Sequence, residues 1–328
     1  MKQARYSTRG PVPQDVIACE TLDTPEPGPG QVRIKVLAAP INPSDVLTLT
    51  GEYGMLPPLP AVGGNEGVGV VEAHGEGVTQ PAVGQTVLIP VGAGTWSTHV
   101  VADAAKLMPL PNGVDPIQLS MLVVNPPTAA LMLSEFVDLQ PGEWVIQNAA
   151  NSAVGGYLIQ IAKARGLKTA NVVRRESAIA DLADSGADVL IVDGPDLHKR
   201  VAEATGKAPI RLGIDAVGGQ STENLARCLA VGGTLVNYGA MSGEPCSISP
   251  ASFVFRDITL KGFWLAQWFR KAAPAQQMAV YADLAKRIAT GELHARVHAT
   301  YPVEAIKDAV AAAASGGRNG KIVIVPTP

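Results

Sequence analysis

The sequence of 328 residues lacks several features that mark common classes of protein. Its three cysteines, Cys19, Cys228 and Cys246, lie far apart, so they indicate neither a disulfide framework nor a cysteine-rich metal cluster. No apolar run reaches about 18 residues, so we expect no membrane span. The formal net charge is −3 and no basic run stands out, which argues against nucleic acid or an anionic membrane as a partner.

A secretory signal is also missing from the start of the chain. Lys2, Arg5 and Arg9 occur in the first twenty residues, but no apolar run follows them. With few and scattered cysteines, this predicts a cytoplasmic protein, although a mature mitochondrial chain would look similar. The length is sufficient for two domains.

The most informative stretch that is present covers residues 143–155. Residues 143–150 predict a buried strand, small and polar residues continue the turn to Ala153, and a helix is expected from Val154 to a stop at Gly166. A second apolar strand follows at 167–173. Strand, tight turn, helix and strand form the opening unit of a dinucleotide-binding sheet, in which the pyrophosphate lies over the helix N-terminus.

The turn lacks the usual G-x-G-x-x-G pattern. Asn148, Ala150 and Ala153 stand at the aligned positions, and only Gly155 and Gly156 are glycines. Small residues still let a backbone approach a phosphate, but the motif alone is weak. An ordinary strand–helix–strand unit without a nucleotide therefore remains an alternative at this point.

The end of the second strand favours a phosphorylated cofactor. NAD sites usually carry Asp or Glu about 20 residues beyond the turn, where it binds the ribose 2′-hydroxyl. Here Arg174 and Arg175 occupy that place, and guanidinium groups suit a 2′-phosphate. We therefore predict NADP(H) rather than NAD(H). Two alternatives stay open, a solvated Arg pair and an acidic role for Glu176.

The rest of the chain divides into two parts that differ in expected secondary structure. Residues 1 to about 120 are β-rich, with expected strands at 31–38, 67–73, 85–91 and 95–101. Helices are expected at 117–122 and 128–136. Strands and helices then alternate, with helices at 178–185, 197–205, 222–230 and 274–290, and strands at 188–192, 212–217, 234–238, 258–264 and 321–325. This predicts an α/β protein with a doubly wound parallel sheet, divided into 1–122 plus 268–328 and 123–267.

Six short segments in this order resemble one family: 41–45 (INPSD), 51–54 (GEYG), 63–67 (GGNEG), 147–155, 237–241 (NYGAM) and 262–265 (GFWL). Together they are similar to the zinc-independent 2-enoyl thioester reductases of the medium-chain dehydrogenase/reductase superfamily, the mitochondrial trans-2-enoyl-CoA/ACP reductase group. Quinone oxidoreductases share part of the set. The resemblance implies a β-rich GroES-like N-terminal domain and a Rossmann domain that binds NADP(H).

The zinc relatives of this superfamily place Cys and His where this chain has neutral side chains. Asn42, Pro43 and Ser44 occupy the first region, and Asn65 the second. Amide and hydroxyl groups are poor zinc ligands beside thiolate and imidazole, so we predict no metal. Asp45 and Glu66 are interpreted as turn and core polar residues.

The resemblance also implies a reaction, in which NADPH reduces the C=C bond of a trans-2-enoyl thioester. Tyr53 matches the catalytic Tyr, and a phenol that keeps its proton at neutral pH suits a proton donor; a packing Tyr is the alternative. Cofactor contacts are implied for Asn125, Asn151, Ser152, Ala153, Val154, Arg174, Arg175, Tyr238, Gly239, Ala240, Met241, Phe263, Trp264, Leu265 and Lys321. For Asn125 a helix cap, for Trp264 a core position and for Lys321 a solvated charge remain as alternatives.

Two other functions compete with this prediction. One is an NADPH-dependent quinone or alkenal reductase, and the other is a nucleotide-binding protein without catalysis. The resemblance further implies a CoA or carrier-protein thioester as substrate, a place in fatty acid metabolism, and a homodimer formed through the sheet edge.

Overall fold

The computed structural model describes residues 1–326, which form two compact units, Met1–Val124 together with the chain from Ala282, and Asn125–Tyr281. The second boundary differs most from the predicted division at 267/268. The helix α10 (Leu265–Lys271) and the first half of α11 (Pro274–Ala289) belong to the second unit. The ring of Phe269 stacks on Tyr281 at 5.2 Å, and Gln277 donates to the carbonyls of Phe269 and Ala272. These contacts tie α11 to α10.

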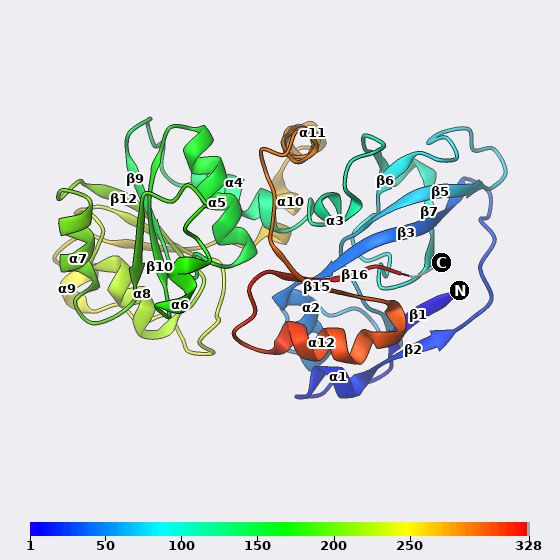
Figure 1. The fold of residues 1–328 in the computed structure, drawn as a ribbon, viewed down its shortest axis with the longest axis horizontal. Coiled ribbons are helices and arrows are strands. Elements are labelled where there is room, and N and C mark those ends of the chain that lie inside the picture. The colour runs from blue at the N-terminus through cyan, green and yellow to red at the C-terminus, as the bar shows by residue number, and fades with distance from the viewer. Residues whose placement is uncertain (327–328) are drawn as a thin grey trace. The chain divides into compact units, whose positions relative to one another are not determined.

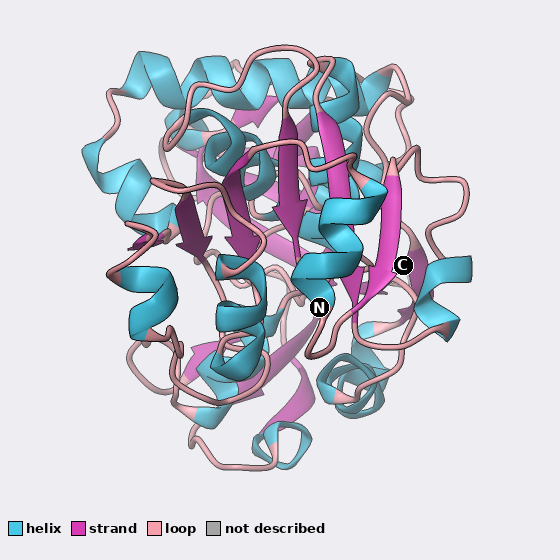
Figure 2. Cartoon of the chain, turned by 90° about the vertical axis from the view of Figure 1, so that its left-hand side faces the viewer, coloured by secondary structure: helices cyan, strands magenta, loops and turns pink. Residues whose placement is uncertain are grey.

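The unit of Asn125–Tyr281 is built on a six-stranded parallel sheet. Its strand order is β11–β10–β9–β12–β13–β14, with bounds Val189–Val192, Lys168–Val173, Trp144–Gln147, Ile210–Asp215, Thr234–Asn237 and Thr259–Gly262. Helices lie on both faces of the sheet (Figures 1 and 2). The predicted doubly wound α/β fold is confirmed. Because the order reverses between β9 and β12, a ligand crevice is expected outside the carboxyl ends of these two strands.

The sequence explains why these elements form. All four residues of β9 are buried, as expected for a central strand covered on both faces. Helix α5 (Ala153–Ala164) buries an apolar stripe that includes Leu158 and Ile161, and Ser152 caps its N-terminus. Gly166, at φ +70°, follows the end of the helix.

Some helices of this unit differ from the predicted ones: α6 ends at Ala180 rather than at 185, and α9 was not predicted. A further difference concerns α4, which begins at Asn125 rather than at 128. Pro126 and Pro127 lie inside its first turn, where a missing N–H costs no hydrogen bond. The bounds are α4 Asn125–Ser134, α6 Ser177–Ala180, α7 Leu197–Ala204, α8 Gly219–Ala226 and α9 Pro250–Phe253.

The other unit contains the GroES-like sheet. Six strands pair in the order β15–β16–β3–β5–β6–β8, a seventh, β7, pairs with the first half of β3, and a smaller sheet has the order β2–β1–β4. The bounds are β1 Lys2–Tyr6, β2 Ile17–Thr21, β3 Gln31–Ile41, β4 Ala61–Val62, β5 Val68–His74, β6 Thr86–Leu88, β7 His99–Asp103, β8 Met108–Pro109, β15 Val297–Tyr301 and β16 Lys321–Ile324. The long strand β3 alternates between partly and fully buried residues along its first half, as expected for a strand with one face on the core.

Helices and the last strand complete this unit. Strand β16 pairs antiparallel with β3, with Ile322 opposite Ile41, so the C-terminal segment joins the N-terminal sheet. The helices are α1 Pro13–Val16, α2 Pro43–Thr50, α3 Pro116–Ser120 and α12 Ile306–Ala314. Helix α2 was not predicted, and it positions residues that matter below. Across residues 1–326, no helix combines the length and apolar character needed to cross a membrane.

Candidate active site

The N-terminus of α5 has the properties of an anion site. The Ser152 hydroxyl accepts the N–H of Gly155 at 3.1 Å, and the Ser152 carbonyl accepts the N–H of Gly156. Within residues 1–326 the N–H groups of Ala153 and Val154 have no hydrogen-bond acceptor. Free N–H groups and the positive end of the helix dipole fit the pyrophosphate of a dinucleotide at this point.

Side chains, rather than glycines, hold the turn before α5 in shape. Asn148 donates through Nδ2 to Oδ1 of Asp215 at 2.6 Å and accepts the N–H of Ala216 through Oδ1 at 2.7 Å. Gln147 donates to the carbonyl of Gly155 at 3.0 Å. Ala149 adopts φ +46°, a left-handed conformation that is costly for a residue with a Cβ atom. The side-chain anchors on both sides of Ala149 maintain this conformation.

Asp215 is a functional-site residue that the sequence analysis missed. It is fully buried at the carboxyl end of β12. Besides Asn148, its carboxylate accepts hydrogen bonds from the backbone N–H groups of Val217 and Gly218 and from the side chains of Thr222 and Asn237. It therefore links the ends of β9, β12 and β13. A lone acidic residue at the end of an apolar strand was the available signal.

Two glycines allow close backbone contacts at this edge. A Cβ atom at Gly155 would lie 2.5 Å from the carbonyl oxygen of Ala150, and one at Gly239 would lie 2.8 Å from that of Ala216. Both distances are too short for a side chain, so glycine is required. Ala153 is the first residue of α5.

The segment after β13 lies beside the α5 turn. Tyr238 interacts with the side chain of Ser152, and burial raises the pKa of its hydroxyl well above the usual value, with this hydrogen bond opposing the shift. The N–H of Met241 donates to the carbonyl of Ala216, and the Met241 side chain is exposed. Gly239 and Ala240 lie between them. The structure thus gathers 148–154 and 238–241 at the carboxyl edge of the sheet.

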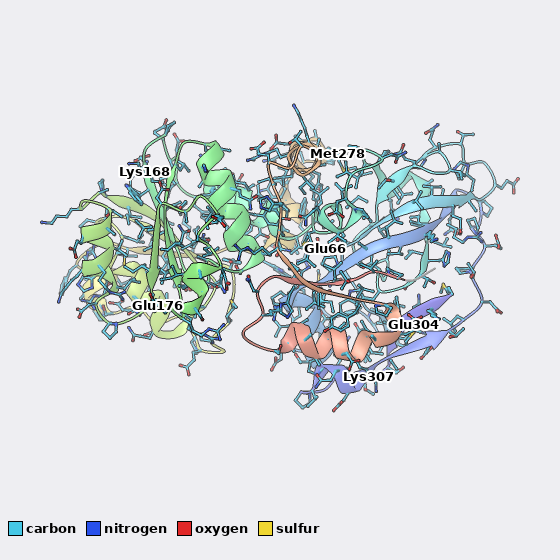
Figure 3. All side chains as sticks on the ribbon, in the orientation of Figure 1. Glu66, Lys168, Glu176, Met278, Glu304 and Lys307 are labelled. Carbon is cyan, nitrogen blue, oxygen red and sulfur yellow. The ribbon has the colours of Figure 1, made fainter. Side chains whose placement is uncertain are left out.

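The ends of β10 and β14 reach the same edge. Arg174 and Arg175 directly follow β10 and are exposed, and neither forms an ion pair with any part of the chain that the structure describes. Glu176, labelled in Figure 3, is also exposed and caps nothing with its side chain. The N–H of Phe263, just past β14, donates to the carbonyl of Asn237.

An aromatic and cationic group surrounds the start of α10. Phe263 packs edge-on against Phe136 at 6.0 Å, and the guanidinium of Arg270 lies 5.1 Å from the ring centre of Trp264. Trp264 is the N-cap of α10, Leu265 is its first residue, and no residue of α10 is fully buried. Trp264 is therefore not a core tryptophan.

Asn125 and Tyr53 lie in different units and differ in burial. Asn125 is buried as the first residue of α4, which packs on α5, so it is not a cap preceding Thr128. Tyr53 belongs to the other unit and is partly buried, just after the C-terminus of α2. The N–H groups of Gly51, Glu52 and Tyr53 all donate to the carbonyl of Leu47, at 3.0, 2.9 and 3.1 Å. Gly51, at φ +90°, makes this sharp C-terminal turn possible.

A buried polar network lies beside α2 in the same unit. Asp45, Glu66, Lys321 and Asn42 are all at least nine-tenths buried, and Glu66 lies among the elements of this unit in Figure 3. Asn42 donates to Glu66 Oε1 at 2.6 Å and accepts from Lys321 Nζ at 2.5 Å. Lys321 is thus not a solvated charge; its ammonium also bonds the carbonyl of Ile41 at 2.9 Å.

Burial dominates the electrostatics of this network. Desolvation raises the pKa of the Asp45 carboxyl to about 6 and also raises the pKa of Glu66. It lowers the pKa of the Lys321 ammonium, which the two carboxylates oppose. Asp45 Oδ2 accepts the N–H of Asn42 at 2.7 Å, so Asn42 and Asp45 form a capping box for α2. Asp45 thus lies in the first turn of α2 rather than in a loop turn, and Glu66 lies in the core.

The comparisons with known proteins agree with this arrangement. Residues 28–112 match the alcohol dehydrogenase GroES-like domain, and residues 153–283 match the zinc-binding dehydrogenase family. The chain is 40% identical over 306 residues to the mitochondrial enoyl-acyl-carrier-protein reductase of Rattus norvegicus, covering 92% of this chain and 82% of that protein. The chain belongs to the enoyl-acyl-carrier-protein reductase family of medium-chain dehydrogenase/reductases.

Solved structures of this family have the same fold. The Etr1p complex with NADP and crotonyl-CoA matches 99% of both chains with a TM-score of 0.89 and 28% identity. A putative NADPH:quinone reductase from Bacillus thuringiensis also matches 99% of both chains, with a TM-score of 0.88 and 28% identity. The predicted cytoplasmic location is wrong, because the curated relatives from rat, cattle, human and mouse are named as mitochondrial enzymes. The scattered cysteines on which that prediction relied fit either compartment.

Proposed function

We propose that the protein reduces the C=C bond of trans-2-enoyl thioesters at the expense of NADPH. The observation that carries this proposal is the match of the whole fold to Etr1p, whose structure holds NADP and crotonyl-CoA. When bound, NADPH supplies a hydride to the β-carbon of the substrate. The thioester then carries the negative charge as an enolate until its α-carbon takes a proton, and the products are the acyl thioester and NADP⁺.

Tyr53 is the proposed proton donor. A proton source must reach the substrate from a defined position, and the Tyr53 backbone is anchored to the last turn of α2 through Leu47. The substrate is expected beyond this loop, which also exposes apolar side chains at Met55, Leu56 and Leu59. An apolar loop next to the proton donor suits an acyl chain.

The cofactor fits the unit that contains the parallel sheet. The α5 N-terminus provides free N–H groups for the pyrophosphate, and exposed Arg174 and Arg175 provide guanidinium donors for the 2′-phosphate. We keep Asn125, Tyr238, Phe263 and the residues around them as proposed contacts along the nicotinamide side. Lys321 remains a proposed contact only through the family resemblance, because its ammonium donates to Ile41 and Asn42 within its own unit.

The reaction is proposed to need no zinc. In this chain the amides of Asn42 and Asn65 occupy the regions where zinc relatives carry ligands, and both donate to carboxylates, those of Glu66 and Asp45. Across residues 1–326 no cluster of three His, Cys, Asp or Glu side chains has the geometry of a metal site. Activity that survives prolonged EDTA treatment would support the proposal, and stoichiometric zinc in the active protein would oppose it.

A homodimer through the sheet edge is also proposed. Among the described strands β14 pairs only with β13, so its outer side is open. In the segment that precedes it in the chain, Phe253, Val254 and Phe255 are 55%, 64% and 81% exposed. An open strand and a run of exposed apolar side chains both favour association with a second copy. The outcome to measure is the mass in solution by light scattering.

The deciding experiment for the function is an absorbance assay. The purified protein is mixed with NADPH and crotonyl-CoA, with NADH and a naphthoquinone as parallel controls. Loss of NADPH absorbance with crotonyl-CoA supports the proposal. The quinone reductase from Bacillus thuringiensis has the same fold, so oxidation of NADPH by the quinone alone would assign the protein to that activity instead.

A further inference from the structure

The carboxylate of Glu66 accepts hydrogen bonds from two separate segments of its unit. Its Oε1 accepts the amide of Asn42, which begins α2, and its Oε2 accepts the backbone N–H groups of Val123 and Val124 at 3.0 and 2.9 Å. Glu66 itself is fully buried, and the hydroxyl of Thr95 holds its backbone carbonyl at 2.7 Å. A fixed carboxylate therefore joins two segments that are far apart in the sequence.

The hydrogen bond to Asn42 connects Glu66, through α2, to the loop of Tyr53. Asn42 and Asp45 cap α2 at its N-terminus, so the position of Asn42 sets where the helix begins. The helix spans Pro43–Thr50, and its last turn anchors the Tyr53 N–H through Leu47. A helix of this length is a rigid element of about 12 Å. A shift at Asn42 is therefore transmitted to the loop that carries Tyr53.

The hydrogen bonds to Val123 and Val124 connect Glu66 to the segment that precedes Asn125. Val123 and Val124 directly precede Asn125, which begins α4 and is a proposed cofactor contact. Glu66 thus fixes the segment in front of one proposed cofactor contact and the helix in front of the proposed proton donor.

We propose that Glu66 is a positioning residue for the reduction: one carboxylate oxygen sets the placement of Tyr53 through Asn42 and α2, and the other fixes Val123 and Val124 at the end of the same unit. This inference rests on the proposed function. It requires an oxygen that accepts on both sides, because Asn42, Val123 and Val124 all approach the carboxylate with N–H donors. An amide at this position presents its NH₂ group to one of those donors.

The geometry offers a matched rescue. In Glu66→Gln, the amide NH₂ faces either Asn42 Nδ2 or the N–H groups of Val123 and Val124. In the double variant Asn42→Asp with Glu66→Gln, the new carboxylate at 42 accepts from Lys321 and from the amide at 66, whose oxygen accepts the two backbone N–H groups. Charge, size and donor count are then the same as in the wild type, and the carboxylate has moved from residue 66 to its hydrogen-bond partner at residue 42.

The experiment compares kcat, KM and the solvent deuterium isotope effect for crotonyl-CoA reduction by NADPH. For Glu66→Gln we expect kcat to fall about 10- to 100-fold, the effect of a small misplacement of reacting groups. The solvent isotope effect should rise, because proton transfer from a displaced Tyr53 becomes slower. The double variant should recover most of the lost kcat. Ser97→Ala, which removes a buried hydrogen bond to Gly94 in the same unit, is the control and should keep both values.

Other outcomes separate the hypotheses. Unchanged kcat in Glu66→Gln, or a fall that Ser97→Ala shares and the double variant does not reverse, would overturn the positioning role. If Glu66→Gln does not fold, the comparison uses Glu66→Asp, which keeps the charge but shortens the side chain; a normal kcat and isotope effect there also overturn it. Failure of the wild type to oxidise NADPH with crotonyl-CoA would instead reject the proposed function.

Discussion

Asn148 Nδ2 and Asp215 Oδ1 lie 2.6 Å apart at the carboxyl edge of the parallel sheet, where β9 and β12 meet. Both residues are buried. This contact stands in place of the first glycine of the usual dinucleotide turn. The turn keeps its shape because a side chain crosses to the next strand, and so cofactor binding depends on an amide–carboxylate pair.

Asn148→Ala should therefore weaken both stability and cofactor binding. The substitution removes one donor from Asp215 and leaves the buried N–H of Ala216 without its acceptor. We expect a loss of about 1–3 kcal/mol in the free energy of unfolding, typical of an unsatisfied buried polar group, and a clearly weaker NADPH affinity. Urea unfolding and a fluorescence titration measure the two effects.

Gln118→Ala is the control for that variant. Gln118 makes a similar pair of hydrogen bonds with the backbone of Ala295 in the other unit. It should lower stability without changing NADPH affinity. Equal losses of affinity in both variants would mean that the Asn148 effect reflects general destabilisation.

Arg174 and Arg175 should determine the preference for NADPH. Replacing both by Ser removes the charge-assisted donors for the 2′-phosphate, each of which contributes about 1.5–3 kcal/mol in favourable geometry. We expect the Kd for NADPH to rise at least about tenfold, while the Kd for NADH stays the same. Lys168→Ser, at the opposite end of β10, is the control for the loss of a positive charge elsewhere on the same strand. A parallel loss of NADH affinity would contradict the assignment.

Tyr53→Phe should separate the two candidate reactions. Removal of the hydroxyl takes away the proton donor, and general acid catalysis typically contributes about 10²- to 10⁴-fold. We expect kcat for crotonyl-CoA to fall within that range with little change in the Kd for NADPH. Reduction of a quinone needs no protonation at carbon and should change little. Full activity on the thioester would reduce Tyr53 to a packing residue.

Asp45 should leave a signature in the pH dependence of stability. Its pKa is raised from 3.8 to about 6 in the folded protein, so between these values the unfolded chain binds fewer protons than the folded one. Stability from this group is then full below about pH 4 and falls as pH rises to about 6, by about 2–3 kcal/mol. The fall should be shallower in Asp45→Asn. Identical slopes in urea unfolding from pH 4 to 6 would refute this.

Phe255 provides the test of the proposed dimer. Phe255→Glu places a charge on the most exposed large apolar side chain of the described residues, a few residues before β14 in the chain. A charge buried without a partner is costly, so the dimer should dissociate at concentrations where the wild type is dimeric. Light scattering gives the mass, and Met278→Glu, on the exposed face of α11 (Figure 3), is the control. A wild-type protein that is monomeric removes the proposal.

Local patterns were enough to predict the architecture. The buried run at β9, the small residues of the turn and the stripe of α5 identify a dinucleotide unit, because strand and helix periodicities are properties of neighbouring residues. The alternation that follows leads to a parallel sheet, which the strand order confirms. The place of Arg174 and Arg175 after a strand could also be predicted, because the strand is identified by its own apolar residues.

The parts that could not be predicted depend on contacts between distant residues. Asp215 carries no signal until it meets Asn148, and Lys321 reads as a solvated charge until β16 pairs with β3 and buries it beside Asn42. Helix α2 is short, and the sequence around its N-terminus is typical of a loop, so the helix was not predicted. The second domain boundary was misplaced because stacking of Phe269 on Tyr281 is a tertiary contact.

The anchoring of Asn148 by Asp215 also has a consequence for folding order. The partners are separated by 67 residues, so the turn before α5 cannot be completed by its own strand–helix–strand segment. Contacts between residues far apart in sequence form late, since loop closure costs entropy first. A chain still emerging from the ribosome would contain the complete turn sequence yet bind no nucleotide until β12 had docked. Binding of the cofactor thus requires that β9 and β12, the two central strands of the sheet, have already paired.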